Sequence, residues 1–328
     1  MKEFLKLIRW QNLLIVILTM VLMRYFVISP LLSLLTVHLS QAPDVPLHLS
    51  LKMPLADFIL LVVATVCITA AGYVINDYFD IKADLINRGK IIVGTRISRR
   101  KAIMLHSVFN IVGVGAGFYV SARAGSFWLG MLFLIVSGLL YFYSASYKRQ
   151  FLIGNLIVAV LVAMVPLLVV FYEWPYLYSH YSINSVNAPR LSIVLFWVGG
   201  FALFAFLSTL TREIIKDIED FEGDKTYGRN TVPVVMGIPA SRILALILLA
   251  ITVIGLYLVW FFFVNDWFTF SYLTVAVVAP LLMTAIRMIS GRDKQRIHSA
   301  SNFMKLAMLT GILYSLVVRA IITWNLVK

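Results

Sequence analysis

The sequence predicts an all-α membrane protein, built as a bundle of about nine transmembrane helices. Of its 328 residues, 61% are hydrophobic and 13% are charged, whereas soluble domains carry about 25% charged residues. The mean hydropathy is +0.92, and apolar runs of about 20 residues recur along the whole chain. Because no Gly/Ser-rich linker divides these runs, we expect residues 1–328 to form a single domain.

Each predicted helix is an apolar stretch with polar or charged residues on both sides. The second to seventh stretches contain no charged residue, while the first, eighth and ninth contain one or two basic residues each. Their lengths suit helices that cross a bilayer. The predicted spans are Leu13–Leu35, Phe58–Ile75, Met104–Val120, Phe127–Tyr143, Leu152–Phe171, Leu191–Leu210, Ile243–Phe263, Phe270–Ser290 and Phe303–Trp324.

The connections between these spans alternate in charge. Basic residues gather at the N-terminus and in the second, fourth, sixth and eighth connections, whereas each odd connection holds at most one. The positive-inside rule therefore predicts a cytoplasmic N-terminus and, with nine spans, a C-terminus outside. The net charge of +13 then reflects topology and contact with anionic membrane lipids, and we expect no nucleic acid as a partner.

Two acidic motifs with the same spacing, D-x-x-D-x-x-x-D, stand out in this hydrophobic chain. The two lie 140 residues apart, and each follows an apolar span and precedes a basic connection. Positions i, i+3 and i+7 fall on one face of a helix, so each motif is expected to gather its carboxylates. The first motif consists of Asn76, Asp77, Asp80 and Asp84, and the second of Asp217, Asp220 and Asp224.

The composition of the two motifs indicates a metal site. Like charges on one helical face repel one another and are costly beside lipid, so they predict bound cations. Carboxylate and amide oxygens suit Mg²⁺, which completes its shell with water and phosphate oxygens. A solvated helix end would explain one such cluster but not two with the same spacing. Two facing motifs with basic residues nearby therefore predict a diphosphate site in which the seven motif residues are metal ligands, with the alternative for Asp77 that it orients Asn76.

These motifs make the sequence similar to the UbiA family of intramembrane prenyltransferases. That family carries N-D-x-x-D-x-x-x-D after its second helix and another Asp-rich motif after its sixth, matched here by NDYFDIKAD and DIEDFEGD. Its opening R-x-x-N is matched by RWQN (Arg9, Asn12), and its Tyr-Ser and Lys-Arg pattern by YFYSASYKRQFLIGN. Within the family, REIIKDIEDFEGDKTYGRNTVP looks most like the branch that includes archaeal digeranylgeranylglyceryl phosphate synthase.

The resemblance implies a Mg²⁺-dependent reaction in which a polyprenyl diphosphate, with geranylgeranyl as the expected chain, ionises and alkylates an acceptor. It implies a multi-pass protein of the prokaryotic (inner) membrane with its active site facing the cytoplasm. The apolar prenyl chain would lie between the helices. The catalytic residues implied are Asp80, Asp84, Asp217 and Asp220, and the substrate-binding residues are Asn12, Arg88, Tyr143, Lys148 and Arg212.

The acceptor and one alternative class of protein stay open at this point. In the similar branch the first motif continues into N-R-P and P-S-G-x-I-S, whereas here NRGKIIVGTRIS lacks both prolines. The acceptor could be the lipid geranylgeranylglyceryl phosphate or an aromatic ring, as in quinone or haem biosynthesis. A cation transporter would also explain a repeated acidic motif, although transporter acids usually lie near the middle of the membrane.

Overall fold

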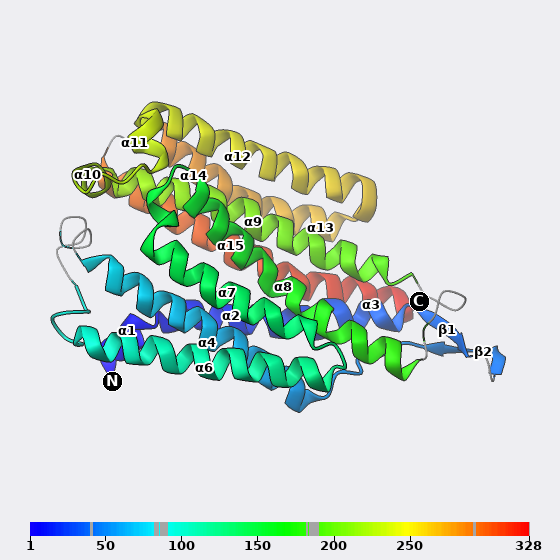
Figure 1. Ribbon diagram of the computed structural model, residues 1–328. Helices are drawn as coiled ribbons and strands as arrows, with labels where there is room; N and C mark the ends of the chain where they lie inside the picture. Colours follow the sequence, from blue (N-terminus) through cyan, green and yellow to red (C-terminus); the bar gives the residue numbers. More distant parts are fainter. Residues whose placement is uncertain are drawn as a thin grey trace.

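The computed structural model describes residues 1–39, 42–81, 85, 91–181, 183, 190–290 and 293–327. Within these ranges the chain is a bundle of long helices with one short β-hairpin (Figure 1). The longer helices are α2 (Trp10–Leu22), α4 (Leu55–Phe79), α6 (Arg99–Arg123), α7 (Trp128–Ala145), α8 (Ile153–His180), α9 (Ser192–Glu219), α12 (Ile238–Val259), α14 (Ala279–Ser290) and α15 (Lys294–Val327). The shorter elements are α1 (Lys2–Leu7), α3 (Ser29–Ser33), α10 (Phe221–Thr226), α11 (Val232–Met236), α13 (Trp267–Tyr272), β1 (Thr36–Leu39) and β2 (Ala42–His48).

The predicted number of membrane-spanning helices is confirmed for the part of the chain that the structure describes. Nine helical segments there are long and apolar enough to cross a membrane. Six of them are α4, α6, α7, α8, α9 and α15, and a seventh is α12 with the turn that follows it. The first and eighth spans each join two α-helices, α2 to α3 and α13 to α14, through a wider π-helical turn.

Prolines explain these two wider turns. The π-helical turns at Met23–Ile28 and Leu273–Val278 each end two residues before a proline, Pro30 and Pro280. A proline has no amide hydrogen and its ring crowds the carbonyl four residues earlier, so the turn before it widens. In the eighth span the carbonyl freed in this way is that of Ala276, which accepts a hydrogen bond from a threonine hydroxyl of α15.

Two helices continue well beyond their predicted ends, which were Phe171 for α8 and Leu210 for α9. Hydropathy falls in both places because charged residues follow. Glu173, however, is buried, and its Oε1 accepts hydrogen bonds from two backbone amides of the segment before α4, so α8 continues past this acid. α9 continues to Glu219, and the second acidic motif therefore begins inside a helix.

The packing of the helices brings both acidic motifs to one end of the bundle. α4 packs along α6, α8 along α9, and α15 along α9 and α14. The ends of α4 and α9 that carry the motifs lie at the same end as the N-terminus and α10, and the C-terminus lies at the opposite end (Figure 1). An odd number of spans places the two termini in this way.

Candidate active site

Both acidic motifs sit where a helix stops at the middle aspartate. α4 ends at Phe79 and Asp80 follows it with φ −91° and ψ 0°. α9 ends one residue before Asp220, which has φ −94° and ψ 8° and separates α9 from α10. This bridge conformation is sparsely populated and frequent at active sites. The expectation of one continuous helical face was wrong for the second motif, because Asp224 belongs to α10 rather than α9.

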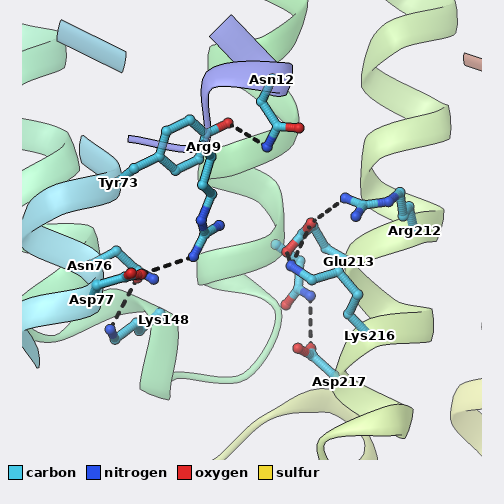
Figure 2. A network of polar contacts seen from close by, with 11 residues as sticks. Arg9, Asn12, Tyr73, Asn76, Asp77, Lys148, Arg212, Glu213, Lys216 and Asp217 are labelled. Atoms are coloured by element: carbon cyan, nitrogen blue, oxygen red, sulfur yellow. Dashed lines mark hydrogen bonds and ion pairs between the residues drawn. The ribbon is translucent and has the colours of Figure 1, made fainter. Parts of the chain in front are cut away.

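Basic side chains contact the first motif from two other parts of the chain. Lys148 Nζ lies 2.7 Å from Asp80 Oδ1 and donates to Asn76 Oδ1 at 3.1 Å. Its side chain is only 6% exposed. Arg9 Nη2 lies 3.0 Å from Asp77 Oδ1 (Figure 2). The first motif therefore meets the N-terminal segment and the connection between α7 and α8 at one place.

Arg229 joins the two motifs directly. Its Nη2 lies 2.6 Å from Asp80 Oδ1, and its Nη1 lies 3.2 Å from Asp224 Oδ1. The turn that follows α10 makes this possible: Gly228 adopts φ +62°, which favours glycine, and the Arg229 amide donates back to the Asp224 carbonyl. The planar guanidinium offers two donors side by side, which suits two carboxylates at once. Acids from both motifs thus meet in one site.

Burial and these cations shift the pKa values of the two linked carboxyl groups in opposite directions. Burial tends to raise the pKa of Asp80, but Lys148 and Arg229 outweigh it and hold the pKa below its ordinary value. Burial raises the pKa of Asp224 to about 6; Arg229 opposes the rise and Asp220 adds to it. The site therefore holds buried negative charge whose protonation depends on the cations beside it.

α9 contributes two further acids to the same end of the bundle. Asp217 Oδ2 accepts a hydrogen bond of 2.8 Å from Asn155 Nδ2 of α8. One turn earlier, Glu213 contacts Lys216 Nζ at 2.8 Å and Arg212 Nη1 at 3.3 Å. Figure 2 shows Glu213 and Asp217 extending from α9 toward the side on which Arg9 lies. The site is therefore bounded by α4, α9 and the N-terminal segment.

The R-x-x-N motif lies at the start of α2 and connects it to α4. Arg9 precedes α2 with φ 50°, and its guanidinium carbon lies 4.8 Å from the centre of the Tyr73 ring. Asn12 Nδ2 donates to Tyr73 Oη at 3.1 Å (Figure 2). Tyr143 of α7 is half-buried and lies within electrostatic reach of Asp80 and Asp217. Aromatic rings thus accompany the charged groups of the site.

The structure brings together most of the residues that the sequence singled out. Asn76, Lys148, Asp80 and Asp224 are linked by direct contacts or through Arg229, and Asp77 contacts Arg9. Arg212 instead contacts Glu213, and Asn12 contacts Tyr73. Two of the predicted residues, Asp84 and Arg88, lie outside the described residues.

Three residues of the site were not predicted: Arg229, Asn155 and Glu213. Arg229 is one of five basic residues in the sixth connection, and no local spacing distinguishes it from the others. Asn155 lies 62 residues from its partner, so only the packing of α8 on α9 reveals the contact. Glu213 lies four residues before Asp217, and this helical spacing could have indicated that the two share a face.

The donor atoms of the site are of the kind that Mg²⁺ prefers. Among the described residues, no three acidic, histidine or cysteine side chains are gathered closely enough to hold a metal ion. The acids are instead paired with the cations Arg9, Lys148 and Arg229. One carboxylate from each motif, Asp80 and Asp224, nevertheless contacts Arg229, and hard oxygen donors of this kind fit Mg²⁺.

Sequence similarity links the chain to a known family. Residues 31–309 match the UbiA prenyltransferase family. Proteins named digeranylgeranylglyceryl phosphate synthase from Methanothermobacter thermautotrophicus and Methanobrevibacter smithii are 33% and 30% identical to the chain. The first alignment covers 77% of this chain and 82% of the relative, and the second covers 88% and 90%.

Solved structures have the same fold. A UbiA homologue from Aeropyrum pernix gives a TM-score of 0.64 at 16% identity, covering 92% of this chain and 97% of that one. A UbiA homologue from Archaeoglobus fulgidus bound to DMAPP and Mg²⁺ gives 0.59 at 18% identity, covering 97% and 99%. The family match spans most of the sequence and sets aside the alternative of a cation transporter. The chain belongs to the UbiA prenyltransferase family.

Proposed function

We propose that this protein transfers a geranylgeranyl group from its diphosphate to geranylgeranylglyceryl phosphate in the biosynthesis of membrane lipids. The observation that carries the proposal is the pair of contacts from Arg229 to Asp80 and Asp224, because they bring both acidic motifs into one site. The relatives named digeranylgeranylglyceryl phosphate synthase align over about three quarters of the chain or more, and they support this choice of acceptor.

In this proposal both motifs hold Mg²⁺. Asn76, Asp77, Asp80 and Asp84 would bind it from one side, and Asp217, Asp220 and Asp224 from the other. When bound, the metal supplies positive charge that stabilises the diphosphate as it leaves. Asp77, Asp80 and Asp224 are paired with Arg9, Lys148 and Arg229, and Asp217 and Asp220 add further carboxylate oxygens of the kind that suit a divalent cation.

The chain's own residues bind and orient the two substrates. Lys148 and Arg229 bind oxygens of the diphosphate, since both are nearly buried and already point at carboxylate oxygens. Asp80 keeps both cations in place. Tyr143 presents its ring to the allylic carbon, where positive charge develops. The Tyr73 ring, held by Asn12, fixes the guanidinium of Arg9 above Asp77.

The transfer forms one bond and breaks one. The free hydroxyl oxygen of the acceptor bonds to C1 of the prenyl chain, and the bond from C1 to the diphosphate oxygen breaks. The electron pair of the broken bond stays on the diphosphate, which takes up the hydroxyl proton as its oxygens become basic. The apolar chains of donor and acceptor lie among the apolar helices of the bundle.

The membrane location follows from the nine spans, and the proposal places the site at the cytoplasmic face of the prokaryotic (inner) membrane. The basic N-terminus and even connections support this orientation. Both acidic motifs lie at the same end of the bundle as the N-terminus (Figure 1). A water-soluble diphosphate product would leave directly into the cytoplasm.

A product analysis tests the proposal. The purified protein is incubated with labelled geranylgeranyl diphosphate, Mg²⁺ and a panel of acceptors that includes geranylgeranylglyceryl phosphate and aromatic acids. We expect a product with the mass of digeranylgeranylglyceryl phosphate, formed only when Mg²⁺ is present. Prenylation of an aromatic acceptor alone would overturn the choice of acceptor. Failure to prenylate any acceptor would overturn the reaction itself.

A further inference from the structure

A second group of charged residues lies beside the acidic motifs, and in this group basic residues outnumber acidic ones. Glu213 is 9% exposed, and Lys216 Nζ contacts both of its oxygens, at 2.8 and 3.0 Å. Arg212 Nη1 contacts Oε1 at 3.3 Å. The Nε of Arg212 is buried, and no hydrogen-bond partner for it exists among the residues that the structure describes. The Glu213 carboxylate thus contacts two cations, and one of them, Arg212, has a buried donor without a partner among the described residues.

Lys305 of α15 adds a third cation at the same level. His298 Nδ1 lies 2.9 Å from Glu219 Oε1, which fixes the register of α15 on α9. α9 and α15 run antiparallel. Seven residues before Glu219 on α9 is Arg212, and seven residues after His298 on α15 is Lys305, so the two basic residues lie at the same level of the bundle. Seven residues are close to two helical turns, so both face the same way as the starting pair. Lys305 is exposed and lies within electrostatic reach of Arg212 and Lys216.

The two groups of charges therefore suit different anions. The acidic motifs gather five described carboxylates, three of which contact Arg9, Lys148 and Arg229. This group favours an anion that arrives with divalent cations. Around Glu213, the three cations of Arg212, Lys216 and Lys305 outnumber the one carboxylate that contacts them, and Glu219, the other acid within electrostatic reach of Lys305, contacts His298. That balance fits an anion of charge about −2 without a metal, such as a phosphate monoester.

We propose that Arg212, Lys216 and Lys305 bind the phosphate of the acceptor lipid, with Glu213 holding the first two cations in position until it arrives. This inference rests on the proposed function and assigns to Arg212 the acceptor rather than the diphosphate expected from the sequence. Glu213 and Asp217 lie one turn apart on α9, about 5–6 Å between Cβ atoms. In a glycerol phosphate the phosphate and the reacting hydroxyl occupy neighbouring carbons, so this spacing directs the hydroxyl toward the prenyl diphosphate at the acidic motifs.

Kinetics with two acceptors test this assignment. Arg212→Met and Lys216→Met are compared with wild type on geranylgeranylglyceryl phosphate and on geranylgeranylglycerol, the same lipid without phosphate. We expect each variant to raise the KM for the phosphate lipid by about tenfold or more, because a charged hydrogen bond to phosphate is lost. The KM for geranylgeranyl diphosphate should stay within about twofold of wild type. Wild type should prefer the phosphate lipid, and in the two variants this preference should be smaller, approaching equal use of both acceptors.

Two controls keep the result specific. Lys225→Met removes an exposed basic residue of α10 at the same end of the bundle, and it should leave every constant unchanged. Lys216→Arg keeps the positive charge and should recover much of the acceptor affinity. An unchanged acceptor KM in both methionine variants, or a rise confined to the diphosphate KM, would overturn the inference. If wild type itself rejects the phosphate lipid and prenylates another acceptor, the proposed function fails instead.

Discussion

At the scale of single residues, Arg229 has the most consequential position in the site. Its side chain is 14% exposed and lies between two carboxylates that are nearly inaccessible to water. Buried acids of this kind need a partner, because an unpaired charge loses its hydration without compensation. Arg229 provides that partner to Asp80 and Asp224 at once, so it contributes to the stability of the fold in addition to its proposed role in binding diphosphate.

Replacement of Arg229 should therefore destabilise the protein in a way that Mg²⁺ reverses. We expect Arg229→Gln to cost about 3 kcal/mol or more of stability without metal, since two carboxylates lose their shared cation. Added Mg²⁺ should raise the melting temperature of the variant more than that of wild type. Thermal unfolding in detergent, with and without Mg²⁺, measures both effects. Lys225→Gln, at an exposed position, serves as control, and an equal response to Mg²⁺ in variant and wild type would contradict the account.

The sequence predicts one part of this site and not the other, for a physical reason. The acidic motifs follow from local spacing, because residues close in sequence share a helix face, and Lys148 follows from the resemblance to the family. The contacts of Arg229 and Asn155 depend on which helix ends meet in space. Hydropathy and charge patterns carry no information on such meetings, so these partners could be found only in the folded chain.

At the scale of helices and turns, the connection between α7 and α8 positions Lys148. A single helical turn at Tyr147–Arg149 carries this lysine, and the first turn of α8 packs against it. Gly154 permits that approach, because a Cβ atom there would lie 2.7 Å from the Lys148 Cα. The constraint comes from close packing against backbone, which cannot move aside as the end of a flexible side chain can.

A methyl group at Gly154 should displace Lys148 without removing its charge. We expect Gly154→Ala to lower kcat/KM for the prenyl diphosphate by roughly tenfold or more, since a misplacement of about 1 Å at a reacting site has large effects. Lys148→Ala should also lower kcat/KM for the prenyl diphosphate. Gly138→Ala is the matched control, because nothing lies within 4 Å of a Cβ at that position. Full activity of Gly154→Ala, with normal membrane insertion, would show that the position of Lys148 is not critical.

The ends of the helices were harder to predict than their number. Long apolar runs fix where a chain crosses a bilayer, and all nine predicted spans have counterparts among the described residues. A charged residue lowers hydropathy whether or not it has a partner. Glu173 lies inside α8, where its Oε1 accepts hydrogen bonds from two backbone amides of a segment about 120 residues away.

At the scale of the whole molecule, the account depends on the orientation of the bundle. Single cysteines at Asp293 and Arg190, on a Cys67→Ala background, report the two ends, since both positions are exposed and lie in connections of opposite parity. In intact cells a reagent that cannot cross membranes should label the cysteine at 190 and spare the one at 293. The reverse pattern would place the active site outside and contradict the proposed orientation.

The central claim is that the two acidic motifs form one Mg²⁺-dependent site, and the transfer rate of three variants tests it most directly. Asp80→Ala and Asp220→Ala each remove one acid from opposite motifs, while Glu222→Gln alters an exposed acid of α10 beside the second motif. Rates of transfer from labelled geranylgeranyl diphosphate are measured over a Mg²⁺ titration, with folded protein quantified in parallel.

Loss of one carboxylate from such a site removes several kcal/mol of transition-state stabilisation, and each 1.36 kcal/mol is about tenfold in rate. The account predicts that Asp80→Ala and Asp220→Ala both fall by about a hundredfold or more at every Mg²⁺ concentration, that Glu222→Gln matches wild type, and that wild type is inactive without Mg²⁺. A folded Asp80→Ala or Asp220→Ala protein with near wild-type rates would contradict a two-sided site.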